Sequence, residues 1–168
     1  RLKDNSFKSF SFRFSTQIYF PISRWIWIKA SSFSWEIVKT LFFEEKLKIC
    51  FQIFKENPSK KILVLCHSKD IVKKIARKLP LLDNFKIAEF HSEQSLLERD
   101  RQAAYFADPE GADILICTEV GSEGRNFEFS HNLILFDIPK LPDQLQQRIG
   151  RLDRIGQKND ILIHLPFI

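Results

Sequence analysis

The chain has 168 residues, of which 44% are hydrophobic and 28% are charged, and this length suggests one domain. Its net charge of +5 belongs to the first third, because residues 1–57 hold 10 Lys+Arg and 5 Asp+Glu whereas residues 58–168 hold 16 of each. The basic composition is therefore no evidence for a nucleic-acid surface on the later part, where such a surface would need local clustering of cations.

The cysteines, the histidines and the apolar stretches argue against a disulfide framework, a metal site and a membrane-spanning helix. Cys50, Cys66 and Cys117 form an odd set without a CxxC pair, which indicates buried reduced thiols in a cytosolic protein rather than a disulfide framework. The four histidines are scattered, so we expect no metal site. No stretch reaches the roughly 20 apolar residues that a membrane-spanning helix needs, and we expect no membrane segment. Because methionine is absent and Arg1 begins the chain, we expect it to be part of a longer protein.

Residues 1–39 are rich in serine and aromatic residues. Serine alternates with phenylalanine and is followed by tryptophan and isoleucine, a pattern that resembles a half-buried strand. Glycine, turn dipeptides and capping patterns are missing, however, and local signals that disagree argue against a defined fold. We expect an irregular leader, poorly structured or mistranslated. An aromatic surface for single-stranded nucleic acid is the alternative.

From residue 40 the pattern changes to alternating helices and strands. Helical spacing in residues 41–54 predicts a helix that ends before Pro58. Apolar runs predict strands at residues 61–66, 85–90, 112–117, 132–136 and 161–164, and apolar spacing predicts helices from Ser68 to Pro80, at 94–107 and at 142–152. This alternation predicts an α/β fold with a parallel sheet covered on both faces. Ligands bind at the carboxyl ends of the strands in such sheets.

A polar loop follows the predicted strand at 112–117. It contains Gly121 and Gly124, and glycines let a backbone approach a ligand closely and offer N–H groups to anionic oxygens. A plain turn is the simpler interpretation. The loop is not a Walker motif, because GxxxxGK[ST] occurs nowhere in the chain.

Three arginines follow at three-residue steps, Arg148, Arg151 and Arg154. This spacing predicts that neighbours in the series share a helical face. Arginines on a rigid element suit bidentate contact with phosphate oxygens. The alternative is a solvated helix face, or ion pairs with Asp143 and Asp153.

A family resemblance rests on three stretches in fixed order, ILICTEVGSEGRNF, LILFDIP and QQRIGRLDRIGQ. They resemble motifs five and six in the second RecA-like lobe of superfamily 2 helicases. The RIGQ ending resembles the Swi/Snf-type branch, and GSEGRNF, ERDRQAAYFADPEGADILI and GRLDRIGQKNDILIHLPF resemble its bacterial RNA-polymerase-associated ATPases. The resemblance covers residues 58–168. It implies a RecA-like parallel sheet with helices on both faces, and we place a C-terminally truncated helicase lobe at residues 40–168.

The resemblance also implies roles for individual residues. Arg151 and Arg154 match the family's arginine fingers, which reach ATP bound to the first lobe, so they are the candidate catalytic residues. The candidate ATP-binding and coupling residues are Gln147, Gly150, Gly121, Gly124 and Asn126. The candidate nucleic-acid contacts are Ser68 and Lys69 of motif four (residues 66–69) and Thr118, with helix capping an equal alternative for Ser68. A further family pattern matches His91, Glu98 and Arg99, which we expect to serve packing and lobe alignment.

The implied cofactor is ATP with Mg, the metal being held mainly by the first lobe. The implied partners are double-stranded DNA, RNA polymerase and the first RecA-like lobe of the same protein, in the nucleoid region of the bacterial cytoplasm. Since the Walker lysine and the catalytic carboxylates belong to the first lobe, we expect this chain alone to be inactive. The alternatives are a non-catalytic remnant that binds nucleic acid or polymerase, another Swi/Snf-type remodeller, or an RNA helicase.

Overall fold

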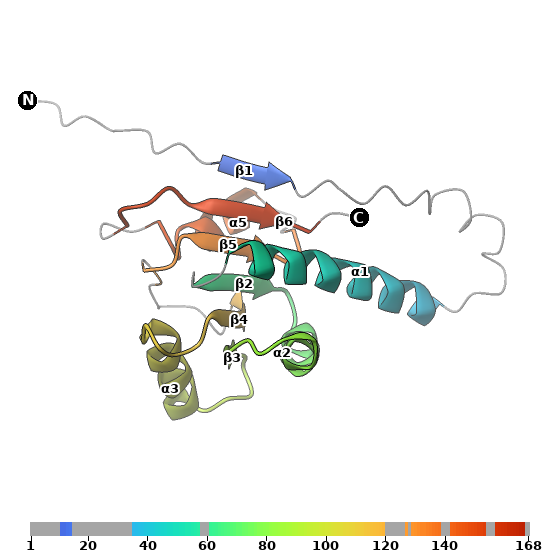
Figure 1. Cartoon of the computed structure of the whole chain (residues 1–168), viewed down its shortest axis with the longest axis horizontal. Coiled ribbons are helices and arrows are strands. Elements are labelled where there is room, and N and C mark those ends of the chain that lie inside the picture. Colours follow the sequence, from blue (N-terminus) through green and yellow to red (C-terminus); the bar gives the residue numbers. More distant parts are fainter. Residues whose placement is uncertain are drawn as a thin grey trace, which may run out of the picture.

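The structure is a computed structural model that describes residues 11–14, 35–57, 61–119, 127, 129–138, 142–153 and 157–166. Within these ranges, six strands form one parallel sheet in the order β1-β6-β5-β2-β4-β3, with helices on both faces (Figure 1). The elements are β1 (Ser11–Phe14), α1 (Trp35–Glu56), β2 (Ile62–Cys66), α2 (Lys69–Leu82), β3 (Ile87–Phe90), α3 (Leu96–Ala107), β4 (Ile114–Thr118), β5 (Asn132–Leu135), α5 (Pro142–Ile149) and β6 (Leu162–Leu165).

Strand β2 lies at the centre of the sheet, between β4 and β5. All five of its residues are buried, which suits a continuous apolar run in a sheet covered on both faces. Its last residue, Cys66, lies opposite Thr118 of β4, and Leu65 lies opposite Leu135 of β5. The carboxyl ends of these three strands therefore meet at one edge of the sheet. The predicted α/β fold with a parallel sheet is confirmed.

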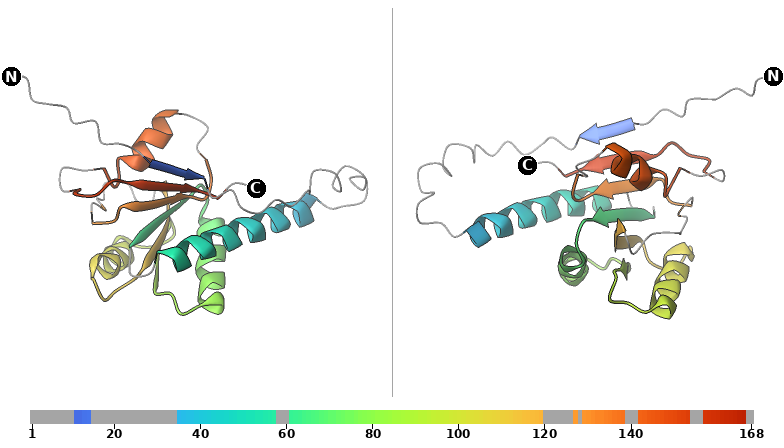
Figure 2. Two further views of the ribbon diagram at one scale, coloured as in Figure 1. Left: turned by 45° about the horizontal axis from the view of Figure 1, so that its top comes forward. Right: turned by 180° about the vertical axis from the view of Figure 1, so that it is seen from behind.

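Helices lie on both sides of the sheet (Figure 2), and the two faces form separate hydrophobic cores. On one face, Ile62 and Val64 pack with residues of α1 and α2, including Ile53 and Ile75. On the other face, neighbouring strand residues pack with Phe106 of α3 and with partly buried residues of α5. Successive strand residues point to opposite faces, so one short apolar strand contributes to both cores.

Two helices end at residues other than those predicted from the sequence. Helix α2 continues through Pro80 to Leu82, so the predicted end at the proline is wrong. The proline removes only its own N–H bond, and the N–H of Asp83 closes the last turn on the carbonyl of Leu79. Helix α5 ends at Ile149. Arg151 therefore lies in the turn after the helix, and the prediction that it shares a helical face with Arg148 is wrong.

Part of the predicted leader is regular. Residues Ser11–Phe14 form β1, which pairs in parallel with β6 and places Ser11 opposite Leu162. Helix α1 begins at Trp35, before the predicted change of pattern at residue 40. Residues 1–10 and 15–34 lie outside the described part, and an irregular leader stays a prediction.

Two buried cysteines, Cys50 and Cys66, have raised pKa values. Burial raises the pKa of Cys50 to about 12 and also raises the pKa of Cys66, so neither thiol is a ready nucleophile.

No helix in the described ranges could cross a membrane. Nor do those ranges contain a group of three His, Cys, Asp or Glu residues placed to hold a metal ion.

Substitutions of two neighbouring residues of α3 test how much the core that contains Phe106 contributes to stability. Phe106 is fully buried and contacts the rings of Phe127 and Phe129, whereas Tyr105 is exposed. We expect Phe106→Ala to lower the free energy of unfolding by about 3–5 kcal/mol, because it leaves a cavity. Tyr105→Ala, the control, should change it by less than about 1 kcal/mol. Urea unfolding measures both, and equal losses would contradict the described packing.

Candidate functional site

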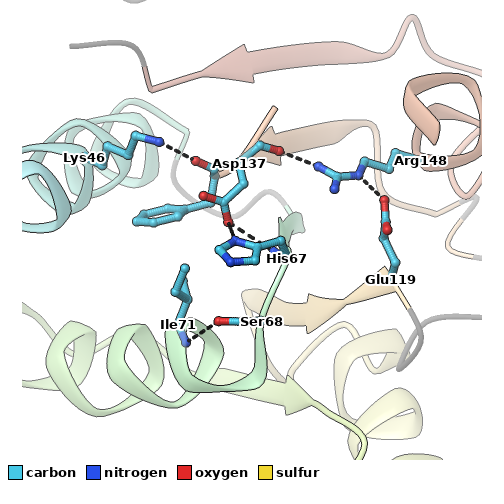
Figure 3. Close-up of polar contacts among 8 residues, drawn as sticks. Lys46, His67, Ser68, Ile71, Glu119, Asp137 and Arg148 are labelled. Carbon is cyan, nitrogen blue, oxygen red and sulfur yellow. Dashed lines mark hydrogen bonds and ion pairs between the residues drawn. The ribbon is translucent and has the colours of Figure 1, made fainter. Parts of the chain in front are cut away.

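The carboxyl ends of β2, β4 and β5 carry polar residues directly after the apolar strands (Figure 3). His67 follows β2, Glu119 follows Thr118 at the end of β4, and Asp137 lies two residues beyond β5. This is the edge at which parallel α/β sheets bind ligands. The structure thus brings residues of motifs four and five to the same edge.

Arg148 of α5 joins two of these strand ends. Its side chain is only 4% exposed; Nε donates to Oε1 of Glu119, and Nη1 donates to the backbone carbonyl of Asp137 (Figure 3). Charge-assisted hydrogen bonds of this kind are among the strongest in proteins. These partners differ from Asp143 and Asp153, which the alternative interpretation of the arginines named. Its contacts attach α5 to the ends of β4 and β5.

Asp137 also holds the segment after β2. Its Oδ2 accepts a hydrogen bond of 3.1 Å from the backbone N–H of His67 and lies 2.9 Å from Nδ1 of the same residue. Beside it, Nζ of Lys46 in α1 donates to the carbonyl of Phe136 at 3.0 Å. The sequence patterns predicted no role for Asp137, Glu119 or Lys46. The two carboxylates could have been found from the sequence, because each is a polar residue just after a predicted buried strand. No sequence pattern pointed to Lys46.

The candidate nucleic-acid residues have local partners in the structure. Ser68 is the N-cap of α2, and its hydroxyl accepts a bond of 3.4 Å from the N–H of Ile71, which confirms the capping alternative. Lys69 pairs with Glu93, and Thr118 is buried at the end of β4. A role for these three residues in binding nucleic acid stays a prediction.

The described part of motif six lies around the end of α5. Gln147 is exposed, and the N–H of Gly150 donates to the carbonyl of Gln146 at 2.9 Å. Arg151 is partly buried; its N–H donates to the carbonyl of Arg148 at 3.3 Å, and its carbonyl accepts from the N–H of Phe127 at 3.0 Å. The backbone of Arg151 is therefore fixed between α5 and Phe127, the last residue of the motif-five stretch.

Several candidate residues lie outside the described ranges, namely Gly121, Gly124, Asn126 and Arg154. The motif-five loop is therefore described only at its two flanks. Glu119 is bound to Arg148 on one side, and Phe127 on the other side is buried against Phe90 and Phe106. Both flanks of the loop are fixed to the body of the domain.

The residues expected to serve packing and lobe alignment lie at the start of α3. Glu98 forms a capping box with Ser95: the Ser95 N–H donates to Oε2 at 2.7 Å, and the Glu98 N–H donates to the Ser95 hydroxyl at 3.2 Å. This bonding holds the pKa of Glu98 below its usual range. His91 is buried, and its Nδ1 and Nε of Arg99 have no hydrogen-bond partner in the described part. Glu98 therefore caps α3, and a role of His91, Glu98 and Arg99 in lobe alignment stays a prediction.

Lys69 shares its partner with Lys73, the residue one turn further along α2. Both ammonium groups form ion pairs with the carboxylate of Glu93, which lies between β3 and α3. Hydrogen bonds from Lys69 and then Lys73 lower the pKa of Glu93 to about 2 from its ordinary 4.5. Glu93 therefore stays ionised at neutral pH.

The buried arginine gives a prediction for stability. We expect Arg148→Ala to lower the free energy of unfolding by about 2–4 kcal/mol, because removing one partner leaves the other charge without compensation. The loss is at the lower end since Glu119 is 39% exposed. The control is Gln146→Ala, because Gln146 belongs to the same helix and its side chain is exposed. Urea unfolding measures both variants, and a loss no greater than that of the control would refute the structural role.

Glu93 gives a prediction for titration. The double variant K69A/K73A should return the pKa of Glu93 from about 2 towards 4.5, because the two donors that stabilise the carboxylate are gone. In the unaltered protein the ion pairs should be lost as the pH falls from about 4.5 towards 2. NMR titration of the side-chain carboxyl measures both values. Glu98, held by Ser95 instead, should titrate unchanged, and an unchanged Glu93 would disprove the pairing.

Comparison with known proteins identifies the relatives of the chain. RNA polymerase-associated protein RapA of Pseudomonas savastanoi pv. phaseolicola is 54% identical over 109 residues, which are 64% of this chain and 12% of that protein. RapA of Pseudomonas syringae pv. tomato is 48% identical over 127 residues, 75% of this chain and 13% of that protein. The chain spans about an eighth of the length of these relatives.

Solved structures show the same fold. The C-terminal part of the Fun30 ATPase domain matches with a TM-score of 0.64 and 19% identity, over 71% of this chain and 39% of that one. The E. coli DEAD-box protein SrmB, solved with the regulator RraA, matches with a TM-score of 0.62 and 23% identity, over 73% and 71% of the two chains. The predicted RecA-like fold is confirmed by these likenesses.

A family model, described as the helicase conserved C-terminal domain, matches residues 45–156. That range contains the strand ends, the Arg148 contacts and the turn that carries Arg151. The chain therefore belongs to the helicase conserved C-terminal domain family, and over the matched residues it is similar to RapA proteins.

Proposed function

We propose that this chain is the second motor lobe of an ATP-dependent DNA translocase that acts on RNA polymerase. The observation that carries the proposal is the placement of Arg151. Its backbone is bonded both to Arg148, which holds the strand ends together, and to Phe127 beside motif five. An arginine side chain at this position would contact the nucleotide. Its backbone contacts would connect it to the elements that we expect to move along the DNA.

Two arginines would make the contribution of this lobe to ATP hydrolysis. Arg151 and Arg154 would neutralise the negative charge that develops on the γ-phosphoryl group of ATP bound to the first lobe. Gln147 and Gly150 would line the same cleft, and Gly121, Gly124 and Asn126 would couple it to the DNA. Mg would be held mainly by the first lobe. Because the chain has no Walker motif, it would not hydrolyse ATP alone.

The DNA side depends on the neighbouring strand ends. Ser68, Lys69 and Thr118 lie at or beside the carboxyl ends of β2 and β4, the same edge that carries Glu119. Lysines and backbone N–H groups near a helix start suit contacts with phosphate oxygens. The bond from Arg148 to Glu119 would transmit a shift of the DNA-contacting edge to Arg151, three residues further along the chain.

Action on RNA polymerase is supported by the relatives. They are named RNA polymerase-associated proteins and are about half identical to this chain over the matched region. A bacterial transcription factor of this kind would act in the cytoplasm, near the nucleoid. The RIGQ ending after the arginines favours a Swi/Snf-type DNA translocase over the second candidate, an RNA helicase.

Substitution of the proposed finger tests the function in the full-length protein. We expect Arg151→Ala to reduce DNA-stimulated ATP turnover by about 10³-fold or more, the range known for arginine fingers. Binding of ATP should change little, because the first lobe holds most of the nucleotide. Steady-state turnover and binding of a fluorescent ATP analogue measure the two effects.

The matched control is Arg101→Ala, an exposed arginine of α3. It should leave turnover unchanged. Retained turnover in Arg151→Ala would contradict the finger role, and stimulation by RNA but not by duplex DNA would favour an RNA helicase. A full-length protein with no turnover at all would favour a non-catalytic remnant.

A further inference from the structure

Two lysines of α2 converge on one small anionic group at the edge of the sheet. Lys69 and Lys73 are one helical turn apart, and each pairs with a different oxygen of the Glu93 carboxylate. The side chains are 44%, 33% and 46% exposed respectively, so solvent and ligands reach all three. Lys69 directly follows Ser68, the N-cap of α2, at the edge where β2 ends.

We infer that Lys69 and Lys73 form a phosphate-binding site on the DNA path, and that Glu93 occupies this site in the absence of DNA as an intramolecular competitor. The inference rests on the proposed function and adds a regulatory contact to it. It assigns a role to Glu93 and Lys73, for which the sequence predicted none.

The chemistry of the pair suits a phosphate group. A phosphodiester, like a carboxylate, offers two oxygens to two ammonium donors, and the start of a helix adds favourable N–H dipoles. Lysine ammonium groups have rotatable donors on flexible stems, so they can exchange one oxygen ligand for another. Asp70, exposed in the first turn of α2, is the other carboxylate close to Lys69. Its negative charge opposes the binding of an anion, so the attraction of a phosphate group depends on the two lysines and the N–H groups at the start of the helix.

Protonation does not release the competitor under physiological conditions. The two lysines hold the pKa of Glu93 at about 2, and Glu93 in turn raises the pKa of Lys69. Glu93 and Lys69 therefore remain charged near pH 7. Exposed ion pairs are weak and easily exchanged, whereas a DNA backbone gains from the release of its own counterions. Displacement by DNA is therefore the available route.

The experiment compares charge removal at two places in the full-length protein. Glu93→Gln keeps the shape of the side chain and removes the competing charge. Glu110→Gln, the control, removes the same charge from the turn before β4, at the opposite edge of the sheet. Binding of a fluorescein-labelled DNA duplex is measured by anisotropy at low salt, and thermal melting checks that each variant is folded.

We expect E93Q to lower the Kd for duplex DNA about threefold to tenfold, because one or two phosphate contacts no longer compete with the carboxylate. E110Q should bind like the unaltered protein. The triple variant E93Q/K69A/K73A should bind no more tightly than K69A/K73A, since the gain depends on the freed lysines.

An unchanged Kd in E93Q, or an equal gain in the triple variant, would overturn the inference. Failure of the proposed function is a separate result: an unaltered protein whose ATP turnover is not stimulated by duplex DNA. If the unaltered protein does not bind the duplex at all, the inference stands when E93Q gains binding and falls when it does not.

Discussion

The buried guanidinium of Arg148 is the contact on which the arrangement of the strand ends depends. A charged group that is only 4% exposed must have hydrogen-bond acceptors, because burial without them would cost several kcal/mol. The acceptors come from the ends of two different strands, Glu119 after β4 and the carbonyl of Asp137 after β5. Helix α5 and these two strand ends are therefore fixed relative to one another, and Asp137 extends the connection to His67.

The same edge of the sheet carries a second kind of ion pair with different physical properties. Glu93 and its lysines are each between one third and one half exposed, so breaking their contacts exchanges them for water at small cost. Arg148 cannot exchange in this way without leaving a buried charge. The contacts of Arg148 are thus suited to hold a fixed geometry. The ion pairs of Glu93 are suited to exchange for contacts with an anionic ligand.

The turn after α5 shows how local and tertiary effects combine. Three-residue spacing placed the arginines on one predicted helix, but the helix ends at Ile149 and Gly150 follows. The N–H of Leu152 donates to Ile149, and the Leu152 side chain is buried in the core under the sheet. Burial of Leu152 together with the bond from Phe127 to the Arg151 carbonyl favours a turn over another helical turn. Spacing alone contains no information about either contact.

Sequence patterns determined the parallel sheet and its elements after residue 58, because these patterns reflect local geometry and burial. Examples are the apolar run of residues 62–66 and the helical spacing of Val72, Ile75 and Leu79. The motif order also determined the family and the candidate residues. Only the tertiary structure decided which charges meet: Arg148 with Glu119 across 29 positions, His67 with Asp137 across 70, and Lys69 with Glu93 across 24. The physical reason is that the strand order β5-β2-β4-β3 does not follow the chain, so partners distant in sequence become neighbours at one edge.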